Sequence, residues 1–232
     1  MTKTRTRVRS NQARPLVDKA VHIQPKTQTQ DRLLRAVESS QLVVTIGPAG
    51  VGKTYCAVNA AVNLLVQGRV KKLVLVRANI PTGKTLGSFP GDIYDKLGPW
   101  LAPMTSEIKK RLGANDYDAK RHSGQIEFHP LETIRGASFE DTIILVDESQ
   151  NLTYEEVKAI TTRIGEGSKM ILMGDPMQRD TRDSGLVEFK KIINKYNLEV
   201  PVIEFTVEDI VRSDLVASLV KAYLFHEKHT TL

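Results

Sequence analysis

The sequence predicts an α/β fold in which a parallel β-sheet carries helices on both faces. Three observations lead to this prediction. Short apolar, β-branched runs alternate along the chain with longer segments of helical periodicity. The run at residues 42–46 leads into a glycine-rich loop and then into a helical pattern. The run at residues 142–147 ends in two carboxylates, as happens where a buried parallel strand delivers polar residues to the carboxyl edge of a sheet.

Each expected strand is an apolar run bounded by polar or turn-forming residues. The expected strands are residues 41–46, 72–76, 125–128, 142–147, 169–173 and 202–205. The expected helices are residues 55–67, a segment that begins at Thr153, and residues 185–196 and 213–226. Thr153 and Glu156 have the spacing of a capping box, which marks a helix start. Because strands and helices alternate, we expect the motifs after the strands to meet in one cleft.

The glycine-rich loop predicts a nucleoside triphosphate as ligand. Residues 47–54 fit the pattern G-x-x-x-x-G-K-[ST] at every specified position. In such a loop backbone N–H groups surround phosphate oxygens at the positive end of a helix, Lys53 adds a charge near the β and γ phosphates, and Thr54 offers a hydroxyl to Mg²⁺. The alternative is a glycine-rich turn that arose by chance. The predicted nucleotide-binding residues are Gly47, Pro48, Ala49, Gly50, Val51, Gly52, Lys53 and Thr54.

Polar residues after two later strands favour hydrolysis of that nucleotide. Asp147 is predicted to hold Mg²⁺ through water, and Glu148 to polarise the attacking water. Gln178 follows the strand at residues 169–173, and its amide can donate to a γ-phosphate oxygen and accept from the water. Exposed acids at a strand end and an ordinary Gly-Asp-Pro turn are the alternative interpretations.

Four segments of the chain resemble one known family. They are IGPAGVGKT, VRANIPTGKTLGSFPGD (residues 76–92), ILVDESQN (residues 144–151) and GSKMILMGDPMQ (residues 167–178). Together they resemble the PhoH-like ATPases, which are related to superfamily 1 helicases. The resemblance implies a single RecA-like P-loop NTPase core that uses ATP and Mg²⁺, RNA unwinding in some members, and hexameric rings. It covers residues 24–232, which we predict to be the ATPase domain, after a basic arm at residues 1–23 that we expect to be disordered.

Two further residues are assigned with the help of this resemblance. Gln30 resembles the adenine-reading glutamine of related helicases, although a polar Gln/Thr stretch is also typical of a solvated linker. Only 54 residues follow Gln178, which is too few for a second RecA-like lobe, so a catalytic arginine is expected from a neighbouring subunit or from the chain's own C-terminal segment. Arg212 is the candidate, with a surface arginine paired to nearby acids as the alternative. A homo-oligomeric, hexameric ring follows as a hypothesis.

Charge and loop composition indicate a nucleic-acid partner, either RNA or single-stranded DNA. The net charge is +6, and residues 1–26 contain seven basic residues and one acid, so this segment accounts for the whole excess. A solubilising arm without a partner is the alternative. Between residues 77 and 124 we expect an insertion, with an amphipathic stretch that is most simply packed core. The predicted nucleic-acid contacts are Arg77, Lys84 and Arg135.

Other classes of function are less favoured but remain open. A P-loop kinase of a small molecule would need a substrate hydroxyl site, whereas Glu148 and Gln178 suit a water nucleophile. A nucleotide-gated binding protein with little turnover is a non-enzymatic alternative. Cys56 is the only cysteine, so an intramolecular disulfide is excluded, and its place in the loop helix predicts a small buried side chain. No apolar run approaches a membrane span, so we expect a cytoplasmic protein without a membrane partner.

Overall fold

The computed structural model describes residues 23–78, 93–134, 138–178 and 183–230. Over these residues six strands form one sheet in the order β3-β2-β4-β5-β1-β6, and every neighbouring pair is parallel. The strands are β1 (Leu42–Ile46), β2 (Lys72–Arg77), β3 (Ile126–Phe128), β4 (Thr142–Asp147), β5 (Lys169–Gly174) and β6 (Val202–Glu204). The predicted parallel α/β fold is confirmed, and each expected strand agrees with an observed one to within a residue at either end.

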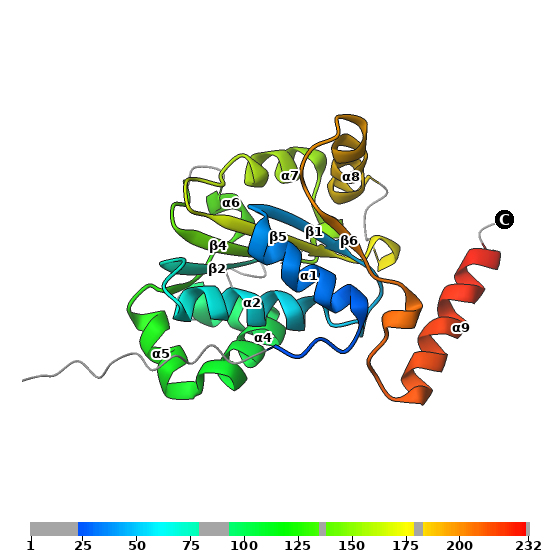
Figure 1. Cartoon of the computed structure of the whole chain (residues 1–232), viewed down its shortest axis with the longest axis horizontal. Helices are drawn as coiled ribbons and strands as arrows, with labels where there is room; N and C mark the ends of the chain where they lie inside the picture. The colour runs from blue at the N-terminus through cyan, green and yellow to red at the C-terminus, as the bar shows by residue number, and fades with distance from the viewer. Residues whose placement is uncertain (1–22, 79–92, 135–137, 179–182, 231–232) are drawn as a thin grey trace, which may run out of the picture.

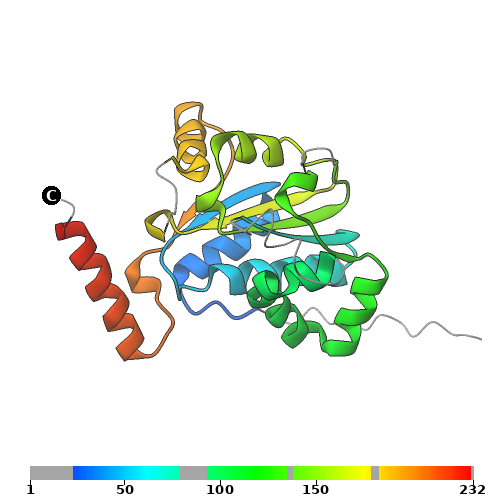
Figure 2. The same ribbon diagram turned by 180° about the vertical axis from the view of Figure 1, so that it is seen from behind.

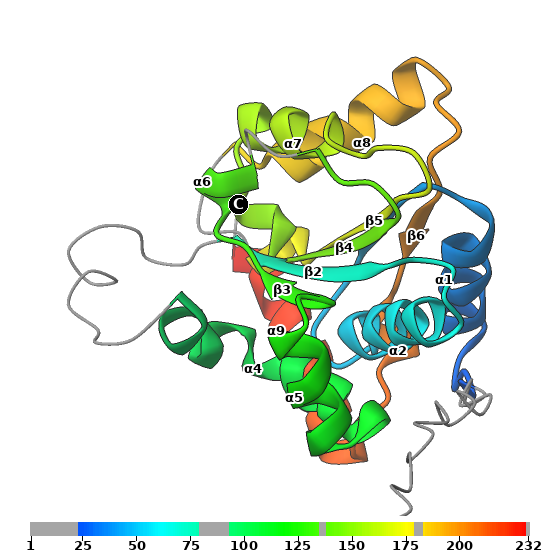
Figure 3. The ribbon, with the colours of Figure 1, turned by 90° about the vertical axis from the view of Figure 1, so that its left-hand side faces the viewer.

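Helices cover both faces of the sheet (Figures 1 and 3). One face carries α1 (Gln28–Ser39), α2 (Lys53–Val66), α4 (Ile93–Leu112) and α5 (Ala114–His122). The other carries α6 (Leu131–Ile134), α7 (Tyr154–Thr161) and α8 (Gly185–Lys195). The predicted capping box is present at the start of α7, where Thr153 accepts from the backbone of Glu156 and the Glu156 side chain accepts from the backbone of Thr153. The sheet is therefore shielded from water on both sides.

Alternating side chains of the strands build two apolar cores, one on each face. In β4, Ile143 and Leu145 belong to the core that α2 covers, whereas Ile144 and Val146 belong to the core that α7 and α8 cover. This alternation follows from the two-residue period of a strand. Because both faces are buried, β4 reads as a continuous apolar run until it reaches the acidic pair at its carboxyl end.

The insertion after β2 contributes a long helix to the first face. Leu97, Leu101, Met104 and Ile108 are buried, so the amphipathic stretch is packed core, as expected. Trp100 lies off this buried stripe, with 40% of the residue exposed. The alternative interpretation of the Gln/Thr stretch around Gln30 as solvated linker does not hold from Gln28 onward, because α1 begins there and buries Leu33 and Val37.

The C-terminal segment returns to the carboxyl edge of the sheet before it leaves the body. After β6, the short 3-10 helix η3 (Val207–Asp209) leads into α9 (Asp214–Thr230), which stands apart from the sheet (Figures 1 and 2). Leu215, Tyr223 and Phe225 of α9 are more than 60% exposed. Among the helices described, none is long and apolar enough to cross a membrane.

Candidate nucleotide site

The carboxyl ends of β1, β4 and β5 open into a cavity of about 580 Å³. These three strands are neighbours in the sheet, so residues that follow them are brought together although they lie far apart in the chain. The lining residues that the sequence singled out are Gln30, Lys53, Thr54, Asp147, Glu148 and Gln178, together with Arg77, Arg212 and residues of the glycine-rich loop. The motifs predicted to share a cleft therefore do share one.

The loop between β1 and α2 is shaped to accept an anion. Gly50 and Gly52 have φ angles of 86° and 91°, which a side chain would strain. The first helical bond of α2 runs from the N–H of Cys56 to the carbonyl of Gly52, and Gly52 provides no side-chain cap. The N–H groups of the first turn therefore have no acceptor within the helix, and the positive end of its dipole faces the cavity loop. Phosphate oxygens fit this arrangement.

Lys53 directs its ammonium group into the same loop. Its Nζ donates to the carbonyls of Gly47, at 2.6 Å, and of Pro48, at 2.9 Å. Burial lowers the pKa of Lys53, and the nearby carboxylates of Asp175, Asp147 and Glu148 partly oppose this shift. A cation held in a poorly hydrated position gains from the arrival of an anion such as a triphosphate.

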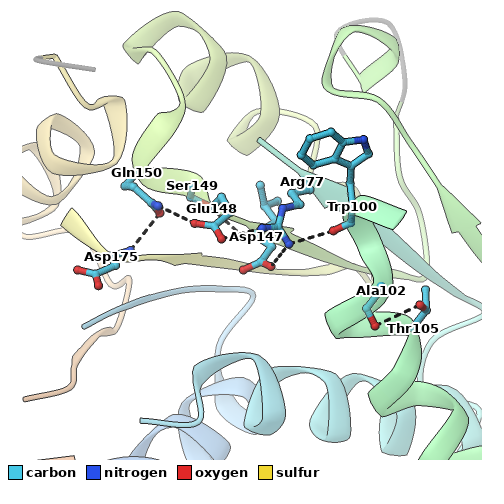
Figure 4. A network of polar contacts seen from close by, with 10 residues as sticks. Arg77, Trp100, Ala102, Thr105, Asp147, Glu148, Ser149, Gln150 and Asp175 are labelled. Carbon is cyan, nitrogen blue, oxygen red and sulfur yellow. Dashed lines mark hydrogen bonds and ion pairs between the residues drawn. The ribbon is translucent and has the colours of Figure 1, made fainter. Parts of the chain in front are cut away.

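The acidic pair at the end of β4 faces the loop across the cavity. Burial raises the pKa of Asp147, and the neighbouring Arg77 guanidinium partly offsets the effect. Arg77 donates to Glu148 Oε1 at 2.9 Å and lies 3.4 Å from Asp147 Oδ2 (Figure 4). A buried carboxylate with incomplete charge compensation fits a divalent cation, and Thr54 lines the same cavity. Arg77, predicted to contact nucleic acid, is thus placed at the nucleotide cavity.

Gln150 connects the carboxyl ends of β4 and β5, a role that was not predicted from the sequence. It is 1% exposed and lies in the 3-10 helix η1 (Ser149–Asn151). Its Nε2 donates to Glu148 Oε2 at 2.6 Å, and its Oε1 accepts from the backbone N–H of Asp175 at 3.0 Å (Figure 4). A glutamine three residues beyond a strand-end aspartate is the sequence signal that could have pointed to it.

Gln178 follows β5 and lies next to Gln150. It ends the 3-10 helix η2 (Pro176–Gln178), and its backbone N–H donates to the carbonyl of Asp175 at 3.0 Å. Its backbone carbonyl lies 3.5 Å from Nε2 of Gln150. The residue is exposed at the cavity wall, so its amide can reach a ligand there.

Gln30 holds the loop rather than simply facing the cavity. Its Nε2 donates to the carbonyl of Val51 at 2.9 Å, and its Oε1 accepts from the N–H of Lys26 at 2.8 Å. The residue is 1% exposed, and an added Cβ at Gly52 would lie 2.6 Å from its Nε2. Its amide therefore fastens the segment before α1 to the phosphate loop.

Arg212 lies against the phosphate loop of its own chain. The N–H of Val211 donates to the carbonyl of Gly50 at 3.1 Å, and a Cβ added at Gly50 would come within 3.0 Å of Arg212 Cγ. Arg212 also lines the cavity. The remaining two residues predicted to contact nucleic acid, Lys84 and Arg135, lie outside the described residues.

The sheet, the loop and the shared cavity define a P-loop NTPase with a RecA-like α/β core. The chain belongs to the PhoH-like family, since the family model described as PhoH-like protein matches residues 22–224. A solved structure with a similar fold is the large terminase of a thermophilic bacteriophage, with a TM-score of 0.56 and 15% identity, over 83% of this chain and 49% of that one.

Several curated relatives are similar over most of this chain. The PhoH-like protein of Bacillus subtilis strain 168 is 38% identical over 208 residues, which cover 88% of this chain and 65% of the relative. That of Mycobacterium leprae strain TN is 36% identical, over 89% and 60%. Protein PhoH of Escherichia coli K12 is 31% identical, over 85% and 57%. The chain thus spans less than two thirds of the length of these relatives.

Proposed function

We propose that this protein is a Mg²⁺-dependent ATP hydrolase. The observation that supports the proposal most strongly is that Lys53, the Asp147–Glu148 pair and Gln178 line one cavity at the carboxyl edge of the sheet. A phosphate-binding loop, carboxylates for a metal and a water, and an exposed polar amide are the groups that phosphoryl transfer to water requires.

Each side chain then has a separate task in the proposed reaction. Lys53 and the N–H groups at the start of α2 bind the phosphates. Thr54 and Asp147 are the residues that would hold Mg²⁺, which when bound neutralises charge on the phosphate oxygens. Glu148 orients the attacking water and accepts its proton. Gln178 contacts the terminal phosphate and the water from the other side of the cavity.

Steady-state release of inorganic phosphate from ATP tests the proposal. Turnover should need Mg²⁺ and stop when EDTA is added. Lys53→Ala should lose nucleotide binding, whereas Glu148→Gln should keep binding and lower kcat by about 100-fold or more. Glu155→Gln, an exposed acid on α7, is the matched control and should behave as the wild type. Unchanged turnover in Glu148→Gln would contradict the assigned role of Glu148.

The proposal extends to RNA or single-stranded DNA as the partner and to a ring-shaped oligomer in the cytoplasm. Its support is the basic segment at residues 1–26 and the resemblance to a family in which RNA unwinding has been attributed to some members. Phosphate release should rise when single-stranded RNA or DNA is added, and the effect should weaken steeply with salt. Light scattering coupled to size exclusion, with and without ATP, would measure the oligomeric state.

The same assay separates the two alternative functions. A small-molecule kinase would release little free phosphate until an acceptor with a hydroxyl group was added. A nucleotide-gated binding protein would bind ATP in equilibrium dialysis and release almost no phosphate under any condition.

A further inference from the structure

Arg77 joins the acidic pair of the cavity to helix α4. It ends β2 and is paired in register with Asp147 on the neighbouring strand β4. Its Nη2 donates to Glu148 Oε1 at 2.9 Å, while its Nη1 donates to the backbone carbonyl of Trp100 at 2.9 Å (Figure 4). Nη1 also lies 3.4 Å from Asp147 Oδ2. One guanidinium therefore contacts both carboxylates and the backbone of α4.

These contacts conflict with the proposed Mg²⁺ site. The guanidinium lies against Asp147, the residue assigned to the metal, and its side chain is only 20% exposed. Two cations beside one carboxylate repel each other, and water screens this repulsion poorly in a buried site. A terminal phosphate supplies new anionic oxygens for the planar guanidinium, which pairs well with such groups. Arg77 then relieves this repulsion and gains an anionic partner if it turns from Asp147 toward that phosphate.

Helix α4 lacks backbone hydrogen bonds near the residue that Arg77 contacts. Pro99 and Pro103 both lie inside the helix, and a proline has no N–H to donate to the preceding turn. Downstream of the prolines the helix is tied to α2, because Asn59 donates to Glu107 at 3.2 Å and Arg111 donates to Asn63 at 2.7 Å. The Arg77 contact to the Trp100 carbonyl therefore acts between the two prolines, where the helix can bend.

We propose that Arg77 is a phosphate-binding residue. When Mg²⁺ and a nucleoside triphosphate bind, it exchanges its contacts with Asp147 and the Trp100 carbonyl for the terminal phosphate, and so shifts the part of α4 around Trp100. The inference rests on the proposed function, since it needs Mg²⁺ and nucleotide in the cavity. It adds a path by which binding in the cavity affects the protein surface, because Trp100 is exposed and meets Arg77 through its backbone carbonyl (Figure 4).

Trp100 is the only tryptophan in the sequence, so its fluorescence reports on this segment directly. We expect a saturable change in emission when Mg²⁺ and a non-hydrolysable ATP analogue are added to the wild type, and a smaller change with ADP. In Arg77→Met the change should be lost. In Arg77→Lys it should be reduced, because an ammonium group is a point charge that does not reproduce the planar fork.

Nucleotide affinity provides a second measurement, which would not change if Arg77 had only a structural role. Equilibrium dialysis should show that the preference for the triphosphate analogue over ADP is about tenfold smaller in Arg77→Met than in the wild type. This is the size expected for one lost charge-assisted hydrogen bond. Arg35→Met removes a positive charge from the exposed face of α1, and it should keep both the emission change and the preference.

The outcomes separate this inference from the proposed function. No binding of the analogue to the wild type would overturn the proposed function itself. Binding without any change in Trp100 emission, or an equal change in Arg77→Met, would overturn the role of Arg77. If the methionine variant does not fold, the lysine variant decides, since an unreduced response and an unchanged preference for the triphosphate would also contradict the proposal.

Discussion

The side-chain amide of Gln150 lies 2.6 Å from the carboxylate of Glu148 and donates a hydrogen bond to it. The same amide accepts from the backbone of Asp175, so the ends of β4 and β5 are joined through one buried side chain. Glu148 itself has a φ of 54°, in the left-handed region that ordinary residues rarely adopt. Gln150 and Arg77 therefore fix the direction of a carboxylate whose backbone is already restricted.

Replacing Gln150 by leucine should impair catalysis more than binding. Leucine fills a similar volume but leaves Glu148 without one donor and the N–H of Asp175 without its acceptor. We expect kcat for ATP to fall by about 10–100-fold, because misplacement of a catalytic group by about 1 Å has effects of this size. The dissociation constant of a non-hydrolysable analogue should change little. Gln41→Leu, on an exposed glutamine, is the control, and an unchanged kcat in Gln150→Leu would remove the residue from the mechanism.

The contact between Arg212 and the phosphate loop predicts that this arginine acts within its own chain. Arg212→Ala should bind nucleotide and lose turnover, since an arginine that stabilises the transferring phosphate contributes about 10³–10⁵ in rate. Mixing Arg212→Ala with Lys53→Ala distinguishes the two arrangements. If Arg212 acts in cis, as its packing on Gly50 favours, the mixture stays inactive. Recovery of activity on mixing would show that one subunit completes the site of another.

The fold could be predicted from the sequence because its signals are local. Each strand is an apolar run, and the loop at residues 47–54 identifies itself by its glycines and Lys53. The order of the strands was not predictable in the same way, because β1 lies beside β5 rather than β2, and such pairings depend on contacts between distant segments. Helix α1 was also missed, since its Gln/Thr-rich start reads as linker until Thr27 is seen to cap it.

The candidate site likewise contains residues that could be predicted from the sequence and contacts that could not. Asp147 at the end of β4 and Gln178 after β5 were predicted to share a cleft because parallel strands end at a common edge, and both line the same cavity. The position of Arg77 was not predicted, because its side chain donates to Glu148, and this contact depends on β4 being the neighbour of β2. Gln30 was identified as a site residue, but its hydrogen bonds to Val51 and Lys26 could not be read from the chain.

Asp147→Asn should stabilise the nucleotide-free protein at neutral pH. Burial raises the pKa of Asp147, so its ionised form is disfavoured in the fold. The folded state then binds a proton more tightly than the unfolded state, and stability falls as the pH rises from the ordinary value for aspartate through the raised one. We expect the asparagine variant to melt about 2–4 °C higher at pH 7, equivalent to about 1 kcal/mol.

Calorimetry at several pH values tests the predicted direction of this change in melting temperature. The gain should vanish in acid, where the wild-type carboxyl is protonated in both states. Asp141→Asn, on an acid that is paired with Lys71 near the surface, should show no comparable gain. A lower melting temperature for Asp147→Asn at pH 7 would mean that the Arg77 contact outweighs the cost of burial.

Nucleotide affinity should fall at high pH, and the fall should begin at a lower pH than the ordinary pKa of a lysine predicts. Burial lowers the pKa of Lys53 in the free protein, whereas a bound phosphate favours the protonated form. Binding above the lowered pKa must therefore take up a proton, and the affinity drops by up to about tenfold per pH unit. Fluorescence anisotropy of a labelled ATP between about pH 7 and about pH 10 would measure it. Lys53→Arg does not deprotonate in this range, so a pH dependence equal to that of the wild type would contradict the assignment.

Gln30→Leu tests whether this glutamine reads the base or holds the loop. Leucine keeps the volume of the buried position but can neither donate to the carbonyl of Val51 nor accept from the N–H of Lys26. The loop then loses its link to the segment before α1, so its N–H groups are less well placed for any triphosphate. We expect ATP and GTP to lose affinity by the same factor, about tenfold, which is the size of one or two lost buried hydrogen bonds. Competition binding with both nucleotides gives the answer: a loss confined to ATP would identify Gln30 as a reader of adenine instead.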